Sequence, residues 1–297
     1  MKKSIFKKKR FYALLVLVPL IIFVFQFSKF RSSDQDFIEL FEQNGFSECG
    51  VERTSMGGVE MRYVWAGPQE KPLLLMVHGS PSSSSFWQAF FEDSLLRREY
   101  RLAAVDRPGF GYSNFGKPIH DLDLQAQLCA KAIKELKPNS GVYVLASSYG
   151  GSVTAKLAMN ESELIDGIVF QSSSLIPEAE KTYSFTHWTK GRFISSLLPT
   201  TIRMANEEKL RHSSELAKIQ NGWSKIKAHI VFLHGSDDGL IYPINAFKAK
   251  EMAINAESSE LKIFEGRGHD LYWTERPALI STLIRMKKNI LLSKAAW

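Results

Sequence analysis

Cysteine is scarce in this sequence, with only Cys49 and Cys129 among 297 residues. Two cysteines are too few for a disulfide framework, so a small disulfide-stabilised scaffold is excluded. The two could pair in an oxidising compartment, but we interpret them as one loop cysteine and one helix cysteine, both free. Repeats and low-complexity segments are also missing, and the length favours one large domain, with or without an inserted subdomain.

Acidic residues are absent from the first 33 positions, which hold eight basic residues. The rest of the chain has 30 basic and 31 acidic residues, so its net charge is −1 although the whole chain carries +7. The positive charge therefore belongs to the N-terminus and not to a nucleic-acid-binding face. We predict no nucleic-acid partner.

Charge is also absent from residues 11–27 (FYALLVLVPLIIFVFQF), an apolar run of 17 residues that follows six basic ones. The run is at the short end of a bilayer-spanning helix. It is longer than a usual signal-peptide core, and no small-residue cleavage site follows it. We therefore predict a basic segment and a transmembrane signal-anchor over residues 1–31; a cleaved signal peptide or a buried core helix is the alternative.

The basic flank of this run predicts a single-pass membrane protein with a cytoplasmic N-terminus. The following domain would then lie on the extracytoplasmic side, which is the periplasm if the host is bacterial. Residues 32–57 are predicted to form a tether with one amphipathic stretch near residues 37–41.

From residue 58 onward, short apolar runs alternate with amphipathic segments. A run that is apolar throughout, such as residues 72–77 (PLLLMV), is typical of a strand buried on both faces. Alternation of such strands with helices predicts the α/β class, with a mostly parallel central sheet flanked by helices. The predicted strands are 60–66, 72–77, 102–105, 141–146, 165–170, 229–233 and 261–264, and the predicted helices are 86–98, 121–136, 149–159, 244–256 and 275–292.

One interval breaks this alternation. More than 50 residues separate the strand that ends near residue 171 from the strand that starts near residue 228. A structureless loop of that length would be implausible in a compact domain. We predict a small helical lid, inserted at about residues 175–224 in a domain that spans residues 58–297.

A serine-rich turn, ASSYGG at residues 146–151, follows one predicted strand and precedes a predicted helix. Small residues two before and two after Ser148 allow a sharp turn that exposes its hydroxyl. Ser147 is the rival nucleophile, but it would place Tyr149 where a small residue is needed. The N-terminus of the predicted helix that follows the turn stabilises negative charge that develops nearby. Together these features make Ser148 the predicted nucleophile.

A serine nucleophile needs a base, and the base needs an acid that orients it. His269 follows the last predicted strand in a glycine-containing loop, which makes it the predicted base. Asp237 and Asp238 are adjacent candidates for the acid, since both follow the strand 229–233. We favour Asp238, three residues past Gly235 and after a tight turn.

An oxyanion hole is predicted from backbone N–H groups. Ser80 lies in the loop HGSP directly after the strand 72–77, and Tyr149 follows the nucleophile. Pro81 has no N–H and cannot serve. His78 in the same loop is interpreted as a structural residue that packs and hydrogen-bonds beneath the loop.

Together, these features resemble the serine-nucleophile branch of the α/β-hydrolase superfamily from about residue 58 to the end of the chain. The order Ser148, Asp238, His269 is the order of that fold. For the motif DRPGFGYS at residues 106–113, the resemblance implies a structural Asp106 that closes a turn. In the motif ASSYGG, Ala146 stands where the family usually has a glycine. The motifs are HGSP at 78–81, DRPGFGYS at 106–113, ASSYGG at 146–151, GSDD at 235–238 and GHD at 268–270.

The resemblance implies a serine hydrolase that cleaves a carboxylic ester through an acyl-enzyme, with neither cofactor nor metal. Epoxide hydrolases and haloalkane dehalogenases resemble this chain in HG-x-P and DRPG-x-G-x-S. Their nucleophile is an aspartate, whereas this chain has Ser148. A C–C bond hydrolase or a perhydrolase with the same triad is the alternative, followed by a non-catalytic binding member of the fold.

Candidate substrate-binding residues are Trp87, within residues 82–87, and Trp188 and Phe193 of the lid, with Leu197 and Leu198 beside them. An apolar lid near a bilayer favours acylglycerols or other lipid-like esters as the small-molecule substrate. The alternative is that these lid side chains only pack the lid onto the core.

Overall fold

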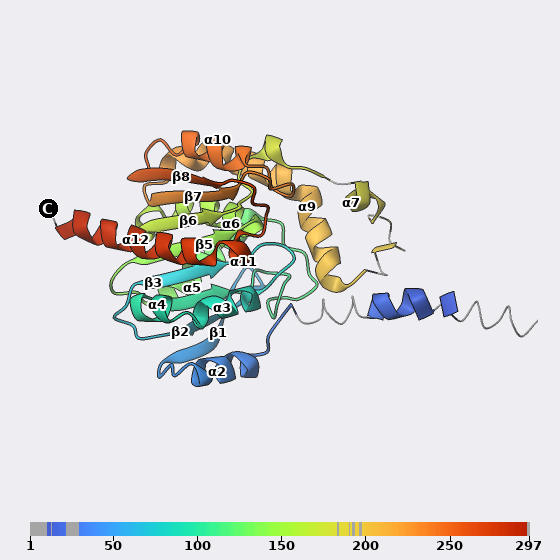
Figure 1. Ribbon diagram of the computed structural model, residues 1–297, viewed down its shortest axis with the longest axis horizontal. Helices are drawn as coiled ribbons and strands as arrows, with labels where there is room; N and C mark the ends of the chain where they lie inside the picture. The colour runs from blue at the N-terminus through green and yellow to red at the C-terminus, as the bar shows by residue number, and fades with distance from the viewer. Residues whose placement is uncertain are drawn as a thin grey trace, which may run out of the picture.

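The computed structural model describes residues 11–12, 14–21, 30–182, 184–189, 191, 194–195 and 198–295. An eight-stranded sheet runs through the middle of the domain in the order β1-β2-β4-β3-β5-β6-β7-β8 (Figure 1). Strand β2 pairs antiparallel with β1 and with β4, and all other neighbours are parallel. The predicted mostly parallel α/β architecture is therefore confirmed. The strands are β1 (Cys49–Met56), β2 (Val59–Ala66), β3 (Leu73–Val77), β4 (Arg101–Val105), β5 (Val142–Ser147), β6 (Gly167–Gln171), β7 (His229–Gly235) and β8 (Ser258–Phe264).

Helices cover both faces of the sheet (Figure 1). One face carries α5, α6 and α10, and the other carries α2, α3, α4, α11 and α12. All five residues of β3 are buried, as expected for a strand covered on both sides. The helices are α2 (Asp34–Gln43), α3 (Gln88–Phe91), α4 (Ser94–Glu99), α5 (Leu122–Leu136), α6 (Tyr149–Asn160), α7 (Ser184–Trp188), α9 (Thr200–Ile219), α10 (Ile244–Met252), α11 (Leu271–Thr274) and α12 (Arg276–Ala295), with 3₁₀ turns at Ser84–Trp87, Ser162–Leu164, Pro177–Ala179 and Gln220–Lys225.

Local sequence explains where several helices begin. Asp121 caps α5 because its carboxylate accepts the backbone N–H groups of Asp123 and Leu124. Asp93 caps α4 in the same way, and this cap divides the predicted helix 86–98 into a 3₁₀ turn, α3 and α4. The prediction of one continuous helix there is wrong because periodicity alone does not register an internal cap.

The predicted transmembrane helix needs correction. Residues 11–12 and 14–21 are helical. In the described part of the chain, no helix combines the length and the apolar character that crossing a membrane requires. Residues 1–10, 13 and 22–29 of the predicted segment lie outside the described residues.

Residues 32–57, for which the sequence predicts a tether, contain α2 and β1. Strand β1 forms the edge of the sheet by pairing with β2 along its whole length. Helix α2 buries Phe37 and Phe41 in the core. Ser33 caps α2 in a capping box with Asp36, which explains the helix start. The folded domain thus begins before residue 58.

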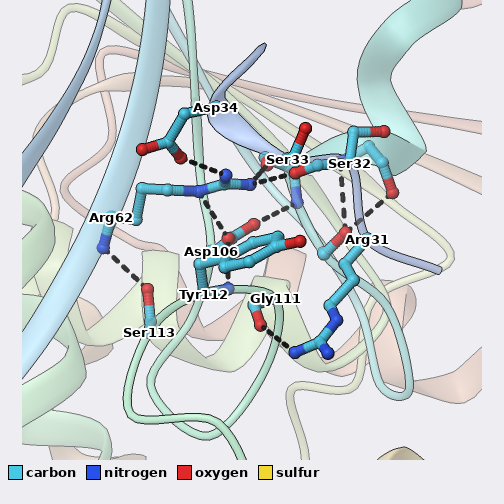
Figure 2. A network of polar contacts seen from close by, with 12 residues as sticks. Arg31, Ser32, Ser33, Asp34, Arg62, Asp106, Gly111, Tyr112 and Ser113 are labelled. Carbon is cyan, nitrogen blue, oxygen red and sulfur yellow. Dashed lines mark hydrogen bonds and ion pairs between the residues drawn. The ribbon is translucent and has the colours of Figure 1, made fainter. Parts of the chain in front are cut away.

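Buried charges fasten the start of this domain to the sheet (Figure 2). Arg62 of β2 is fully buried and bonds Asp106 through Nε at 2.9 Å and Asp34 through Nη1 at 2.8 Å. Asp106 also accepts the backbone N–H groups of Ser84 and Tyr112, both at 2.7 Å. Asp106 therefore closes the turn after β4, as the sequence predicts.

The predicted lid lies between β6 and β7, where the described residues form α7, α9 and two 3₁₀ turns. Helices α7 and α9 project from the end of the sheet at which β5, β6 and β7 terminate (Figure 1). Helix α9 buries one face, including Met204, Glu208, His212 and Leu216. Its length of 20 residues makes it the main element of the lid region.

Candidate active site

Ser148 occupies a strained turn between β5 and α6. Its φ of 53° and ψ of −122° lie where non-glycine residues are rare. Ser148 donates its N–H to the carbonyl of Gln171, and its own carbonyl accepts the N–H groups of Gly151 and Ser174. These bonds hold the strained conformation. Ser148 is half-buried, whereas Ser147 is buried as the last residue of β5.

A cavity of about 290 Å³ lies at this turn. It brings together four of the predicted site residues, Ser80, Ser148, Tyr149 and His269. The remaining lining residues are Ser174, Thr186, Ile202, Ala205, Asn206, Lys209, His212, Leu240 and Ile241. Among the described residues, no cluster of His, Cys, Asp or Glu is suited to hold a metal ion.

His269 and Asp238 are directly hydrogen-bonded. Nδ1 of His269 lies 2.8 Å from Oδ2 of Asp238. The other carboxylate oxygen of Asp238 accepts the N–H groups of Leu240 and Ile241, at 3.0 and 2.9 Å. Because Nδ1–H of the neutral imidazole donates a hydrogen bond to Asp238, Nε2 of His269 carries the lone pair and can act as a base.

Burial alone would raise the pKa of Asp238, but hydrogen bonds from His234 and His269 outweigh it and hold this pKa below its ordinary value. The carboxylate is therefore ionised at neutral pH. The neighbouring Asp237 is exposed and accepts a hydrogen bond from Ser236, not from His269.

The loop that carries Ser80 is held from below by His78 and Arg107. Nδ1 of His78 lies 2.7 Å from the carbonyl oxygen of Gly79, and Nε2 accepts the N–H of Arg107 at 2.9 Å. Burial, and then the nearby Arg107, lowers the pKa of His78 well below its ordinary value. A neutral, fully bonded histidine here agrees with the predicted structural role.

Arg107 links this loop to the lid helix. Its guanidinium donates to the carbonyls of His78 and Gly79 at 2.9 and 3.0 Å, and it forms a buried ion pair with Glu208 of α9 at 2.7 Å. It also lies 4.4 Å from the ring centroid of Tyr149. Sequence reasoning missed this role because Arg107 and Glu208 are 101 residues apart and share no local pattern.

The predicted substrate-binding residues do not line this cavity. Trp87 is fully buried and packs against Phe90 and Tyr272 in the core, so the prediction that it forms a pocket wall is wrong. Its position beside a polar serine run gave no sign of this burial. Trp188 is the last residue of α7, and its side chain is not described. Phe193 and Leu197 lie outside the described residues, and Leu198 is described but does not line the cavity.

Comparison with known proteins gives consistent matches. A family profile described as alpha/beta hydrolase fold matches residues 72–215. A bifunctional esterase/perhydrolase from Acinetobacter calcoaceticus is 34% identical over 108 residues, which cover 35% of this chain and 38% of that protein. Human epoxide hydrolase 4 is 28% identical over 123 residues, which cover 40% of this chain and 32% of that protein. The matched segments thus span only about a third of these relatives.

Solved structures match over more of the chain. An esterase from Exiguobacterium antarcticum superimposes with a TM-score of 0.64 at 19% identity, over 80% of this chain and 98% of the esterase. A bacterial membrane phospholipase A superimposes with a TM-score of 0.60 at 17% identity, over 98% of this chain and 99% of that chain. At such identities the superpositions establish the shared fold.

Proposed function

The chain belongs to the α/β-hydrolase superfamily, and on this premise we propose that it is a serine hydrolase that cleaves a carboxylic ester. The observation that carries the proposal is the cavity that both Ser148 and His269 line, with His269 hydrogen-bonded to the ionised Asp238. A strained serine, a histidine with a free ring nitrogen and a buried carboxylate are the three parts of a nucleophilic triad.

The proposed reaction has two steps. The hydroxyl oxygen of Ser148 attacks the ester carbonyl carbon while Nε2 of His269 takes the hydroxyl proton. Collapse of the tetrahedral intermediate breaks the bond to the alkoxy oxygen, which leaves as the alcohol with the proton from His269. His269 then removes a proton from water while the water oxygen attacks the acyl carbonyl carbon. Collapse of the second tetrahedral intermediate breaks the bond to the Ser148 oxygen, which takes the proton back from His269, and the acid is released.

The backbone N–H groups of Ser80 and Tyr149 are the proposed donors to the oxyanion. Both residues line the cavity, and Tyr149 is the first residue of α6. The first N–H groups of a helix have no acceptor within that helix, so they can serve an anion. Loss of one such donor typically costs about 10²–10³-fold in rate.

The nucleophile favours acyl transfer over the chemistry of the epoxide hydrolases and haloalkane dehalogenases. An alkyl-ester intermediate requires a carboxylate nucleophile, and the turn here carries Ser148 instead. The cavity of about 290 Å³ is at the small end of ligand pockets. Apolar Ile202, Ala205 and Leu240 in its wall favour a short or medium acyl group.

Labelling with a fluorophosphonate tests the nucleophile. We expect the wild-type protein and Ser147→Ala to be labelled, because the activated hydroxyl belongs to Ser148 and Ser147 only ends β5. Ser148→Ala should lose labelling and ester hydrolysis together while melting at the wild-type temperature. Absence of labelling in the folded wild-type protein would contradict the proposed function, and labelling retained in Ser148→Ala would contradict the assignment.

A further inference from the structure

A buried polar network adjoins the cavity on the side of α9. Glu180 is its centre, and its side chain is 3% exposed. One carboxylate oxygen lies 2.5 Å from Nζ of Lys209 and 3.2 Å from Nδ1 of His212, and the other accepts the hydroxyl of Ser174. Burial alone would raise the pKa of Glu180, but His212 and Lys209 lower it to about 2. This carboxylate therefore carries its negative charge at neutral pH.

Ser152 and Glu180 hold the ring of His212 from two sides. The hydroxyl oxygen of Ser152 lies 2.5 Å from the carbonyl oxygen of Ser174, so its only hydrogen must point to that carbonyl. Nε2 of His212 lies 2.8 Å from the same hydroxyl oxygen. Nδ1 of His212 lies 3.2 Å from the carboxylate of Glu180. These contacts fix the position of His212 beside the cavity.

The ionic contact of this network joins Glu180 to Lys209 at 2.5 Å. Arg107 and Glu208 form a separate buried ion pair at 2.7 Å. Charges that are shielded from water interact more strongly over short distances than charges in bulk solvent.

Lys209 presents its ammonium group to the cavity. Its side chain is 21% exposed and lines the pocket together with Asn206 and His212, which lie on one face of α9. An ammonium group has three N–H donors, and among the described residues only the carboxylate of Glu180 accepts one. Lys209 therefore retains capacity to donate to a bound molecule.

We propose that Lys209, with Asn206 beside it, forms a subsite for an anionic group of the substrate, a carboxylate or a phosphate. This inference rests on the proposed ester hydrolysis and names the substrate class: an ester with a second, negatively charged group on its acyl or its alcohol part. The apolar wall at Ile202 and Leu240 would accommodate the intervening carbon chain.

Matched esters test this subsite. On the acyl side, mono-p-nitrophenyl glutarate is compared with p-nitrophenyl pentanoate, which has the same number of acyl carbons and no carboxylate. On the alcohol side, butyryl glycerol 3-phosphate is compared with monobutyrylglycerol. We expect the wild-type kcat/KM to favour the anionic ester in one arm by about 10-fold to 100-fold, the effect of one charge-assisted hydrogen bond. The arm that responds identifies the part of the substrate that carries the charge.

Variants assign the preference to Lys209. In Lys209→Met the ratio of kcat/KM for the anionic over the neutral ester should fall by about tenfold or more, chiefly through KM, and Lys209→Arg should restore part of it. Lys218→Met is the matched control, because Lys218 lies on the exposed face of the same helix. An unchanged ratio in Lys209→Met, or no anionic preference in either arm, would overturn the subsite. Hydrolysis of the neutral esters shows separately whether the proposed function holds.

Discussion

The ring of Tyr149 lies between His212 and Arg107. It stacks on the imidazole of His212 with centroids 4.2 Å apart and an interplanar angle of 27°, and Arg107 lies over the ring at 4.4 Å. Cation–π contacts of this kind are strongest when the partners are desolvated, and all three side chains are buried. The residue whose N–H is proposed to bind the oxyanion is thereby fixed by contacts from both the lid helix and the loop after β4.

Asp238 offers a direct test of how the base is oriented. Asp238→Asn replaces an acceptor with a group that can donate toward Nδ1 of His269, which favours the wrong tautomer of the imidazole. We expect kcat for ester hydrolysis to fall on the order of 10³–10⁴-fold, with little change in KM. Steady-state kinetics on a p-nitrophenyl ester measures this.

Asp237→Asn is the matched control, since Asp237 is adjacent but exposed and makes no contact with His269 in the described structure. It should retain kcat within about twofold. An equal loss in both variants would show that the loop, and not the carboxylate of Asp238, is what the reaction needs.

Between elements, Glu180 ties the segment after β6 to helix α9. The side chains of Lys209 and His212 reach it from α9, and Ser174 reaches it from the same segment after β6. Its pKa of about 2, against an ordinary 4.5, means that the folded state favours the charged carboxylate. This stabilisation is complete above the unfolded-state pKa near 4.5 and is lost as the pH falls toward 2.

We predict that Glu180→Gln is less stable than the wild type at pH 7, by on the order of 3 kcal/mol. The difference in unfolding free energy should shrink steadily as the pH is lowered from about 5 to about 2, because the wild-type carboxylate then becomes protonated. Urea titrations followed by circular dichroism at several pH values measure it.

Glu178→Gln is the control for this pH dependence, because Glu178 is exposed on the 3₁₀ turn beside Glu180. A constant difference between Glu180→Gln and the wild type across the pH range would mean that the network does not stabilise the charged form.

At the scale of the molecule, sequence reasoning worked where the pattern is local. The parallel strands were predictable because β3, β5 and β6 are apolar along their length and buried on both faces. The site residues were predictable as positions because each follows a predicted strand, although β8, which precedes His269, is largely exposed or half-buried. Their roles as nucleophile, base, acid and oxyanion donors stay predictions, which the kinetic and labelling experiments test.

Edge elements and long-range charge contacts were not predictable in this way. All residues of strand β1 except Thr54 are exposed or half-buried, and the strand includes Glu52 and Arg53, so its sequence does not differ from that of a polar linker. The network of Glu180, Lys209 and His212 joins residues about 30 positions apart, and no sequence period reports such pairing. The apolar run at residues 11–27 led to the prediction of a transmembrane helix, which the described part of the chain does not support, because hydropathy alone does not establish a spanning helix.

The last prediction concerns where the folded domain begins. A chain that starts at Gly58 lacks α2 and β1, which removes Phe37 and Phe41 from the core and leaves β2 with an unpaired edge. It also removes Asp34, one of the two carboxylates that pair with the buried Arg62 (Figure 2). Deletion of one buried phenylalanine side chain typically costs about 3–5 kcal/mol, and the stability of a whole domain is about 5–15 kcal/mol.

We therefore expect the chain that starts at Gly58 to lose its cooperative thermal transition and its fluorophosphonate labelling, whereas a chain that starts at Phe30 keeps both. Phe30 is the right control because it retains Arg31, whose guanidinium lies over the rings of Tyr112 and Phe115. Differential scanning calorimetry and labelling on the same samples separate loss of fold from loss of reactivity. A cooperative, labelled chain from Gly58 would mean that α2 and β1 only cover a domain that is already stable without them. Failure of both chains would instead place part of the stabilising structure before residue 30.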